Sequence, residues 1–190
     1  MENPEAYQIL RNHIAEYYEF SEEEWDVISQ YFVFKKLKKH QFLIQHGQPV
    51  PDEFFIVSGL VKSYELQENG KEFIMQFGKE NYWISDFYAL QFKENAKMNI
   101  DCIEDCVVLS LSFENREKMC EINHKMANFF RKKSNKGFIN LQQRVLSLMK
   151  ETAEERYKNL QKNNSDLIQR VPKKLLASFL GVSRETLSRF

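Results

Sequence analysis

The sequence predicts an α+β protein: an N-terminal antiparallel β-roll or jelly roll with flanking helices, then a long helix, then a C-terminal helix-turn-helix. Three observations lead to this prediction. Short runs rich in β-branched and aromatic residues fill residues 40–112, helical spacing resumes after residue 113, and glycine and serine separate two short helical patterns at the C-terminal end. We therefore divide the chain into residues 1–112, 113–142 and 143–190.

Two helices are expected before the β-rich part, over residues 5–19 and 21–32. The second has a clear start signal, because Ser21 is followed three positions later by Glu24. This spacing fits a capping box, in which the serine accepts from the glutamate N–H and the glutamate reaches back to the serine N–H. These helices carry no evident chemistry.

Six short runs then have the composition of strands. Asn69-Gly70 lies between two of them and predicts a two-residue hairpin turn with both central residues at positive φ. Many short strands with turns of this kind favour a roll or jelly roll. The runs are Phe42–Ile44, Phe54–Val57, Leu60–Leu66, Phe73–Phe77, Ile100–Ile103 and Val107–Leu111.

The long helix carries an apolar stripe at three- and four-residue spacing. Its members include Met126, Phe129, Phe138, Leu141, Val145 and Leu148. A stripe on a helix between two domains must be buried somewhere, and a second copy of the same helix is the simplest partner. The alternative is that the stripe packs on the chain's own β domain. Gly137 marks either a kink or a close approach of two helices.

The charges are distributed unevenly along the chain. Residues 131–190 hold 14 Lys and Arg against 5 Asp and Glu, whereas residues 1–130 hold 13 against 22. This asymmetry suggests that the basic end meets a polyanion. The alternative is two solvated surfaces of opposite sign.

The strongest local signal is the segment 172–190, which fits a helix-turn-helix. Apolar residues stand where two short helices would face each other and the core, with the small Ala177 at their crossing. They are Leu176, Leu180, Val182, Leu187 and Phe190. Gly181 suits the left-handed residue that ends the first helix, and Ser183 suits the N-cap of the second. Any two-helix hairpin shares part of this pattern, but here the cap signals, apolar spacing and basic flank all agree.

The second of these helices would enter the major groove of double-stranded DNA. Arginine can bond guanine in a bidentate way and glutamate can accept from cytosine, so Arg184, Glu185 and Arg189 are the candidate base-reading residues. Lysines at the start of the first helix can meet phosphates without reading sequence. The remaining candidate DNA contacts are Ser183, Thr186, Ser188, Lys173 and Lys174.

These residues resemble the Crp/Fnr family, the cyclic-AMP-receptor-like transcription regulators. The resemblance runs from Phe42 to Phe190; it includes the turn glycines between residues 42 and 62, the segment 103–106, and the Arg-Glu-x-x-x-Arg of 184–189. It implies a cyclic-nucleotide-binding-like sensor domain, a homodimer on a two-fold DNA site, a small-molecule effector, and RNA polymerase as a candidate partner. Segments 153–157 and 169–172 resemble a short-chain branch found in Bacteroidetes-type bacteria.

The sensor departs from the family's cyclic-nucleotide pattern. Where the nucleotide-binding members carry Gly-Glu and then Arg-Ser, this sequence has Ser85-Asp86 and approximately Ala96-Lys97. Lysine does not replace the bidentate arginine fork, so we do not expect cyclic AMP as the effector. An unknown ligand would meet Ser85, Asp86, Lys97 and the aromatic residues Tyr82, Trp83 and Phe87. The alternative is that these aromatic residues belong to the core.

Other function classes lack support in the sequence. His13, His40, His46 and His124 do not share metal-ligand spacing, and no nucleophile or phosphate-loop motif is present, so we expect no enzyme activity, no metal and no cofactor. There is no membrane-spanning run or signal peptide, which predicts a cytoplasmic protein. The alternative function is a ligand-binding or protein-docking module whose helix-turn-helix does not bind DNA.

Overall fold

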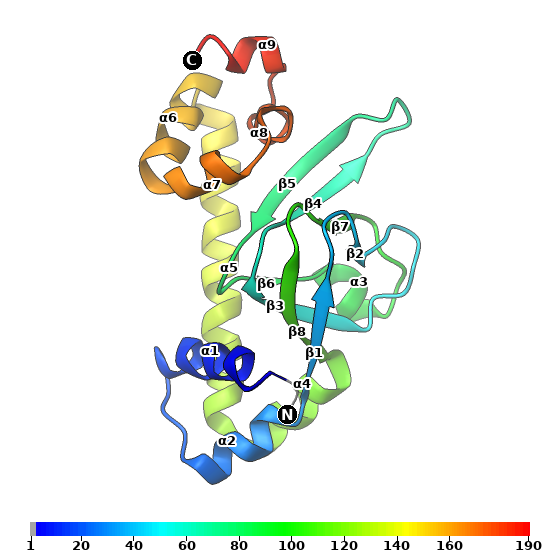
Figure 1. The fold of residues 1–190 in the computed structure, drawn as a ribbon, viewed down its shortest axis with the longest axis vertical. Helices are drawn as coiled ribbons and strands as arrows, with labels where there is room; N and C mark the ends of the chain where they lie inside the picture. Colours follow the sequence, from blue (N-terminus) through cyan, green and yellow to red (C-terminus); the bar gives the residue numbers. More distant parts are fainter. Residues whose placement is uncertain (1–2) are drawn as a thin grey trace. The chain divides into compact units, whose positions relative to one another are not determined.

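The computed structural model describes residues 3–190, which divide into two compact units. The first unit comprises the residues up to Ser63 together with Phe77–Arg131, and the second comprises Tyr64–Gln76 together with Lys132–Phe190. Two adjacent strands and one long helix therefore run from one unit into the other (Figure 1).

The first unit is a β-roll with flanking helices. Its two four-stranded sheets have the orders β1-β8-β3-β6 and β2-β7-β4-β5. Its elements are α1 (Pro4–Ala15), α2 (Glu22–Ser29), β1 (Phe32–Leu37), β2 (Phe42–Ile44), β3 (Asp52–Ser58), β6 (Trp83–Ile84), α3 (Phe87–Phe92), β7 (Asn99–Cys102), β8 (Cys106–Ser112) and α4 (Phe113–Ile122), with parts of β4 (Val61–Leu66), β5 (Glu72–Gly78) and α5 (His124–Lys150).

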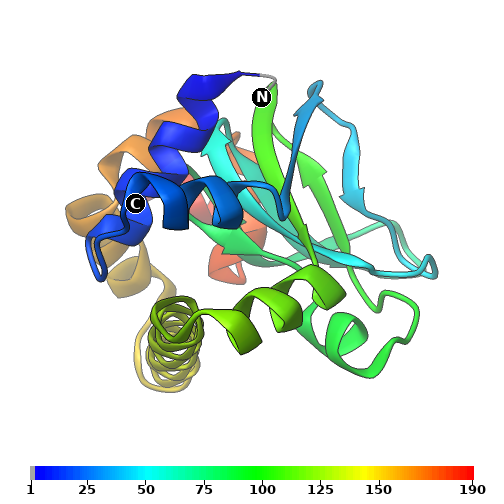
Figure 2. The ribbon, with the colours of Figure 1, turned by 90° about the horizontal axis from the view of Figure 1, so that it is seen from below.

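Two hydrophobic clusters hold this unit together. One cluster fills the roll and includes Phe54, Ile56, Val61 and Ile100. The other joins the outer face of β3 and β8 to the helices, with residues from α1, α2, α4 and the start of α5. Figure 2 shows α1 and α2 to one side of the strands. Alternate residues of β3 belong to the two clusters, because successive side chains point to opposite faces of a sheet.

The predicted α+β fold and all six predicted strands are present, and the capping box of Ser21 and Glu24 is formed at the start of α2. In the first unit, three of the described elements were not predicted: β1, β6 and α3. Strand β1 pairs with β8 from Phe32 opposite Leu111 to Leu37 opposite Cys106, so a partner far along the chain decides its conformation. The helix predicted to reach residue 32 ends at Ser29 for this reason.

The β4–β5 turn differs from the predicted two-residue turn. Gly70 has φ +77°, but Asn69 is not among the residues with positive φ. The Gly70 N–H donates to the Gln67 carbonyl at 2.9 Å, and the Asn69 side-chain oxygen accepts from the Lys71 N–H at 2.9 Å. Because the asparagine side chain closes the turn itself, only the glycine adopts the left-handed conformation, as in a three-residue hairpin loop.

The second unit contains the tip of the β4–β5 hairpin, most of α5, and four short helices. These are α6 (Ala153–Asn163), α7 (Ser165–Arg170), α8 (Lys173–Leu180) and α9 (Arg184–Leu187). Helix α5 runs through Gly137 without interruption, and nothing lies within 4 Å of the position where a Cβ would stand. No helix of the described chain therefore approaches closely at Gly137.

The segment 113–142, predicted as one helix, has different limits in the structure. It begins as α4, is interrupted at Asn123, and continues as α5 to Lys150, beyond the predicted limit. The Asn123 side chain accepts hydrogen bonds from the N–H groups of Lys125 and Met126, which gives α5 its own start. None of the described helices is long and apolar enough to cross a membrane.

Candidate nucleic-acid interface

The turn between α8 and α9 has the geometry of a glycine-terminated helix. Gly181 lies in the left-handed region at φ +74°, and its N–H donates to the Ser178 carbonyl at 3.1 Å. The next N–H, that of Val182, donates to the Ala177 carbonyl at 3.0 Å. This pair of bonds is the Schellman motif, which ends a helix and redirects the chain. The predicted role of Gly181 is therefore confirmed.

Ser183 starts the second helix, also as predicted. Its hydroxyl accepts from the Thr186 N–H at 3.1 Å and lies 3.1 Å from the Thr186 hydroxyl. A side-chain acceptor at this position satisfies one of the free N–H groups of the first turn. The turn and the cap together fix where α9 begins relative to α8.

The buried Leu187 fixes which face of α9 points to solvent. Its side chain is 6% exposed, and Leu176, Ala177 and Leu180 of α8 are 2% exposed each. With 3.6 residues per turn, a buried Leu187 places Glu185 on the opposite face of α9 and Arg184 at its side, while Arg189 follows two residues after the last residue of α9. All three are exposed. Their side chains can therefore reach a groove in front of α9 without rearrangement of the core.

The charge state of Glu185 suits base reading. Hydrogen bonds from its own backbone N–H and from the Ser183 hydroxyl lower its pKa from the usual value. The carboxylate is therefore ionised at neutral pH and can accept from a cytosine amino group.

The other predicted DNA contacts have different surroundings. The Ser188 hydroxyl donates to the Arg184 carbonyl at 2.9 Å, so it serves the end of α9. Lys173 and Lys174 are exposed in the first turn of α8, which has no acidic residue. Positive charges at a helix N-terminus oppose the helix dipole and cost a few tenths of a kcal/mol each. A phosphate close to these lysines would make their position favourable, because it attracts both positive charges.

Two arginines that the sequence analysis did not single out hold the end of α8. Arg144 donates to the Phe179 carbonyl at 3.0 Å, and Arg156 donates to the Leu180 carbonyl at 2.7 Å. Cations are favourable at a helix C-terminus, where carbonyls lack partners within the helix. No spacing rule could have identified either residue, because each reaches carbonyls far away along the chain.

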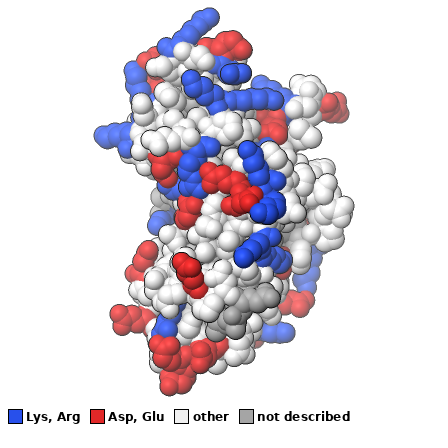
Figure 3. Space-filling view, viewed as in Figure 1, with Lys and Arg blue, Asp and Glu red and all other residues white. Residues whose placement is uncertain are grey.

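The surface of the second unit is rich in lysine and arginine. Figure 3 shows blue side chains over its helices, whereas red side chains gather over α1 and α2 of the first unit. This agrees with the charge asymmetry of the sequence. A basic surface around α9 would supply phosphate attraction that does not depend on sequence.

In the first unit, the structure gives Asp86 a local role. The residue is 1% exposed, and its two carboxylate oxygens accept from the Ala89 N–H at 3.1 Å and the Lys97 N–H at 2.8 Å. It therefore caps α3 and ties it to the segment before β7. The Ser85 hydroxyl donates to the Asp52 carbonyl at 2.9 Å. Two of the three polar side chains proposed for an effector, Ser85 and Asp86, are therefore already hydrogen-bonded to the backbone.

The remaining predicted effector residues do not converge on one cavity. Trp83 packs among Phe32, Phe55, Phe129 and Phe130 in the cluster between sheet and helices, as the core alternative would have it. Tyr82 and Phe87 are 42% and 45% exposed. The Lys97 ammonium pairs with Glu94 at 3.3 Å and lies over the Tyr88 ring.

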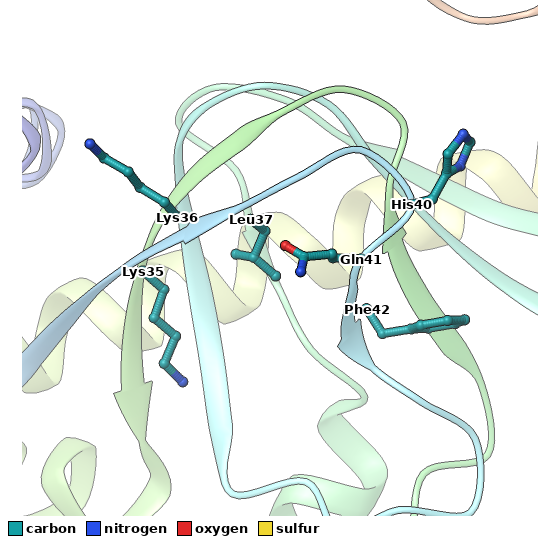
Figure 4. A pocket seen from close by; sticks show the side chains of 6 residues that line it. All are labelled: Lys35, Lys36, Leu37, His40, Gln41 and Phe42. Carbon is teal, nitrogen blue, oxygen red and sulfur yellow. The ribbon is translucent and has the colours of Figure 1, made fainter.

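Another hollow of the first unit lies elsewhere, beside β1. Its volume is about 660 Å³, and it is lined by Lys35, Lys36, Leu37, His40, Gln41 and Phe42 (Figure 4). Figure 4 shows Lys35 and Lys36 pointing to opposite sides of the strand. Lys35 pairs with Asp52 at 3.0 Å. The polar groups do not meet around one point, so this hollow has no convergent binding site.

Comparison with known proteins agrees with this architecture. Residues 34–123 match the family of the cyclic nucleotide-binding domain. No curated protein sequence matches the chain. Among solved structures, FixK2 from Bradyrhizobium japonicum superposes with a TM-score of 0.71 at 20% identity, over 83% of this chain and 81% of that one. A CooA mutant from Carboxydothermus hydrogenoformans gives 0.69 at 18% identity, over 94% and 81%.

The catabolite activator protein of Thermus thermophilus is a third similar structure. It superposes with a TM-score of 0.56 at 18% identity, over 90% of this chain and 81% of that one. At these identities the likeness establishes the fold. The predicted resemblance is thus confirmed for the cyclic nucleotide-binding domain over residues 34–123 and for the fold, and the short-chain branch stays a prediction.

Replacing Asp86 tests its assignment as a cap. We expect Asp86→Ala to lower the free energy of unfolding by about 2 kcal/mol, because a buried helix N-cap and a second backbone bond are lost. Asp86→Asn keeps a side-chain oxygen acceptor and should lose about half as much. Urea unfolding measures both, with Glu94→Ala as an exposed control. A neutral or stabilising Asp86→Ala would mean that the carboxylate is kept for a ligand.

Proposed function

We propose that this chain, whose residues 34–123 are a cyclic nucleotide-binding domain and whose fold is that of the Crp/Fnr regulators, is a sequence-specific DNA-binding transcription regulator. The observation that carries the proposal is the exposed set Arg184, Glu185 and Arg189, on and directly after a helix (α9) whose start, end and buried face are all fixed. Arg184 and Arg189 donate no side-chain hydrogen bond and form no ion pair with the described residues. Their donors are free for guanine O6 and N7.

The surroundings of α9 favour this function over a docking module that does not bind DNA. The two lysines at the start of α8 are unfavourable for the isolated helix and favourable next to a phosphate. The excess of basic over acidic residues in 131–190 has the same explanation. A protein partner would not by itself account for both features.

We infer that two copies pair through the second half of α5. In its first turns Met126, Phe129 and Phe130 are buried in the chain's own core, as the alternative interpretation of the stripe held. Beyond residue 131 the stripe is uncovered: Phe138 is 67% exposed, Leu141 53%, Val145 46% and Leu148 47%. These four residues follow the spacing of a coiled-coil seam. An apolar row of this size favours a partner helix.

A dimer of this kind explains how a short recognition helix achieves specificity. Two copies of α9 related by a two-fold axis would meet half-sites about one helical turn, roughly 34 Å, apart. An effector would act by favouring one dimer geometry over another, which requires different affinities for the two. The backbone bonds of Asp86 and Ser85 support an effector other than cyclic AMP.

The DNA function is tested by selecting bound sequences from random duplexes at moderate salt. We expect a two-fold motif with half-sites about one turn apart. Arg184→Ala should cost about 1–3 kcal/mol of binding free energy and relax selection at particular base positions. Lys173→Ala should weaken all sequences alike. Lys162→Ala, which removes a charge from α6, is the control, and unselective recovery with the wild type would refute sequence-specific reading.

The dimer is tested with matched substitutions on two faces of α5. Val145→Glu places a charge in the apolar row and should shift the protein to a monomer, because an unpaired charge in an interface is strongly unfavourable. Gln143→Glu adds the same side chain on the other face and should leave the assembly unchanged. Light scattering after gel filtration gives the mass of each. A monomeric wild type would contradict the pairing.

Cyclic AMP is expected to leave the melting temperature unchanged. A ligand at 100 times its dissociation constant stabilises the folded state by about 2.7 kcal/mol, which raises the melting temperature by several degrees in a chain of this size. The measurement is a thermal melt at millimolar cyclic AMP. An increase of several degrees that Asp86→Asn abolishes would show that the site binds the nucleotide after all.

A further inference from the structure

Arg144 occupies the point in the second unit where α5, β5 and α8 meet. Its Nη2 donates to the Phe179 carbonyl of α8 at 3.0 Å and to the Ile74 carbonyl of β5 at 3.4 Å. Its guanidinium also lies over the Phe179 ring, 3.7 Å from the centroid. One side chain of α5 therefore connects the helix-turn-helix to the β4–β5 hairpin.

A second contact joins α8 to β5, and together with the two hydrogen bonds of Arg144 it is called a tie below. The Ser178 hydroxyl donates to the Glu72 carbonyl of β5. Glu72 and Ile74 are two positions apart, so their carbonyls point to the same side of the strand. Strand β5 is the last in the order β2-β7-β4-β5, and this side is its free edge. The ties satisfy carbonyls that an edge strand would otherwise leave without partners.

These ties leave the base-reading face of α9 uncovered. Arg184, Glu185 and Arg189 remain exposed while Ser178 and Phe179 hold the hairpin. The ties act on the last turn of α8, just before the left-handed Gly181 and the cap Ser183. A shift of that turn would shift the start of α9, because both follow it within a few residues. The contact therefore bears on the position of the recognition helix and not on its accessibility.

We propose that Arg144 is a positioning residue for DNA reading, through which the β4–β5 hairpin sets the place of α9; this rests on the proposed DNA-binding function. Movement of the hairpin reaches the recognition helix through the carbonyls of Ile74 and Phe179. Both strands of the hairpin continue into the sensor domain, so the ties give that domain a direct connection to the helix-turn-helix.

The chemistry of the site requires arginine. Burial and the neighbouring Arg156 lower the pKa of Arg144 to about 10, so the group is still charged at neutral pH although it is shielded from water. A planar guanidinium can bond two carbonyls and stack on a ring at once, which the ammonium of lysine cannot do. Arg144→Lys thus keeps the charge and removes the connection.

The experiment compares the wild type with Arg144→Lys, Ser178→Ala and the exposed neighbour Gln143→Ala. Each is titrated with a duplex obtained from the selection above and with a scrambled duplex of equal length. We expect Arg144→Lys to lower the ratio of the two affinities about tenfold with little change for the scrambled duplex, because attraction to phosphates depends on charge. Ser178→Ala should lower the ratio less, and Gln143→Ala should not change it.

Amide hydrogen exchange without DNA gives an independent readout. Exchange in α8 and α9 should become faster in Arg144→Lys, while exchange in β3 and β8 should stay as in the wild type. If the thermal melt shows that Arg144→Lys does not fold, Ser178→Ala decides the question, because it removes a single bond.

The outcomes separate the two proposals. A wild type that prefers no duplex refutes the DNA function and, with it, the role of Arg144. A selective wild type with an unchanged ratio in folded Arg144→Lys refutes the positioning role alone. Equal losses for the selected and the scrambled duplex would also refute it, since they would show that Arg144 contributes only attraction to DNA.

Discussion

The packing of one helix sets the conditions for the rest of the molecule. The first turns of α5 place Met126, Phe129 and Phe130 in the core of the first unit, against Phe55 and Trp83. This anchoring uses the apolar stripe of α5 for about two turns and then leaves it without cover. Because the helix continues without interruption to Lys150, its apolar row stays exposed along the rest of its length, and this exposed row is the basis of the proposed dimer.

Capping chemistry defines the elements around this helix. Serine and threonine caps begin α2, α4, α6 and α9, and Asp86 begins α3. Such caps act locally, and this is why the sequence located Ser21, Gly181 and Ser183 correctly. The same chemistry explains Asp86. At the sequence level it stands where the family's cyclic-nucleotide pattern has a glutamate, yet a carboxylate just before a short helix finds backbone N–H groups within reach.

What the sequence could not predict depends on partners far along the chain. Strand β1 contains two adjacent lysines and forms because β8 supplies a complete row of partners. Trp83 is a large aromatic residue of the kind that lines pockets, but its ring packs against Phe32 of β1, Phe55 of β3, and Phe129 and Phe130 of α5. Phe190, which the motif places against the core, is 40% exposed, because the regular helix α9 ends at Leu187. Arg144 and Arg156 donate to backbone carbonyls, and the order of side chains in the sequence does not show which carbonyls will lie near an arginine.

The β4–β5 hairpin limits which parts of this chain can be exchanged in a chimera. A chimera that joins residues 132–190 to a different sensor would carry every residue of the helix-turn-helix but leave Glu72 and Ile74 behind. The transplanted α8 would then meet a foreign strand edge, or none. The unit that keeps these contacts is made of two separate stretches of sequence. A working chimera would have to include the hairpin tip, Tyr64–Gln76, together with the C-terminal helices.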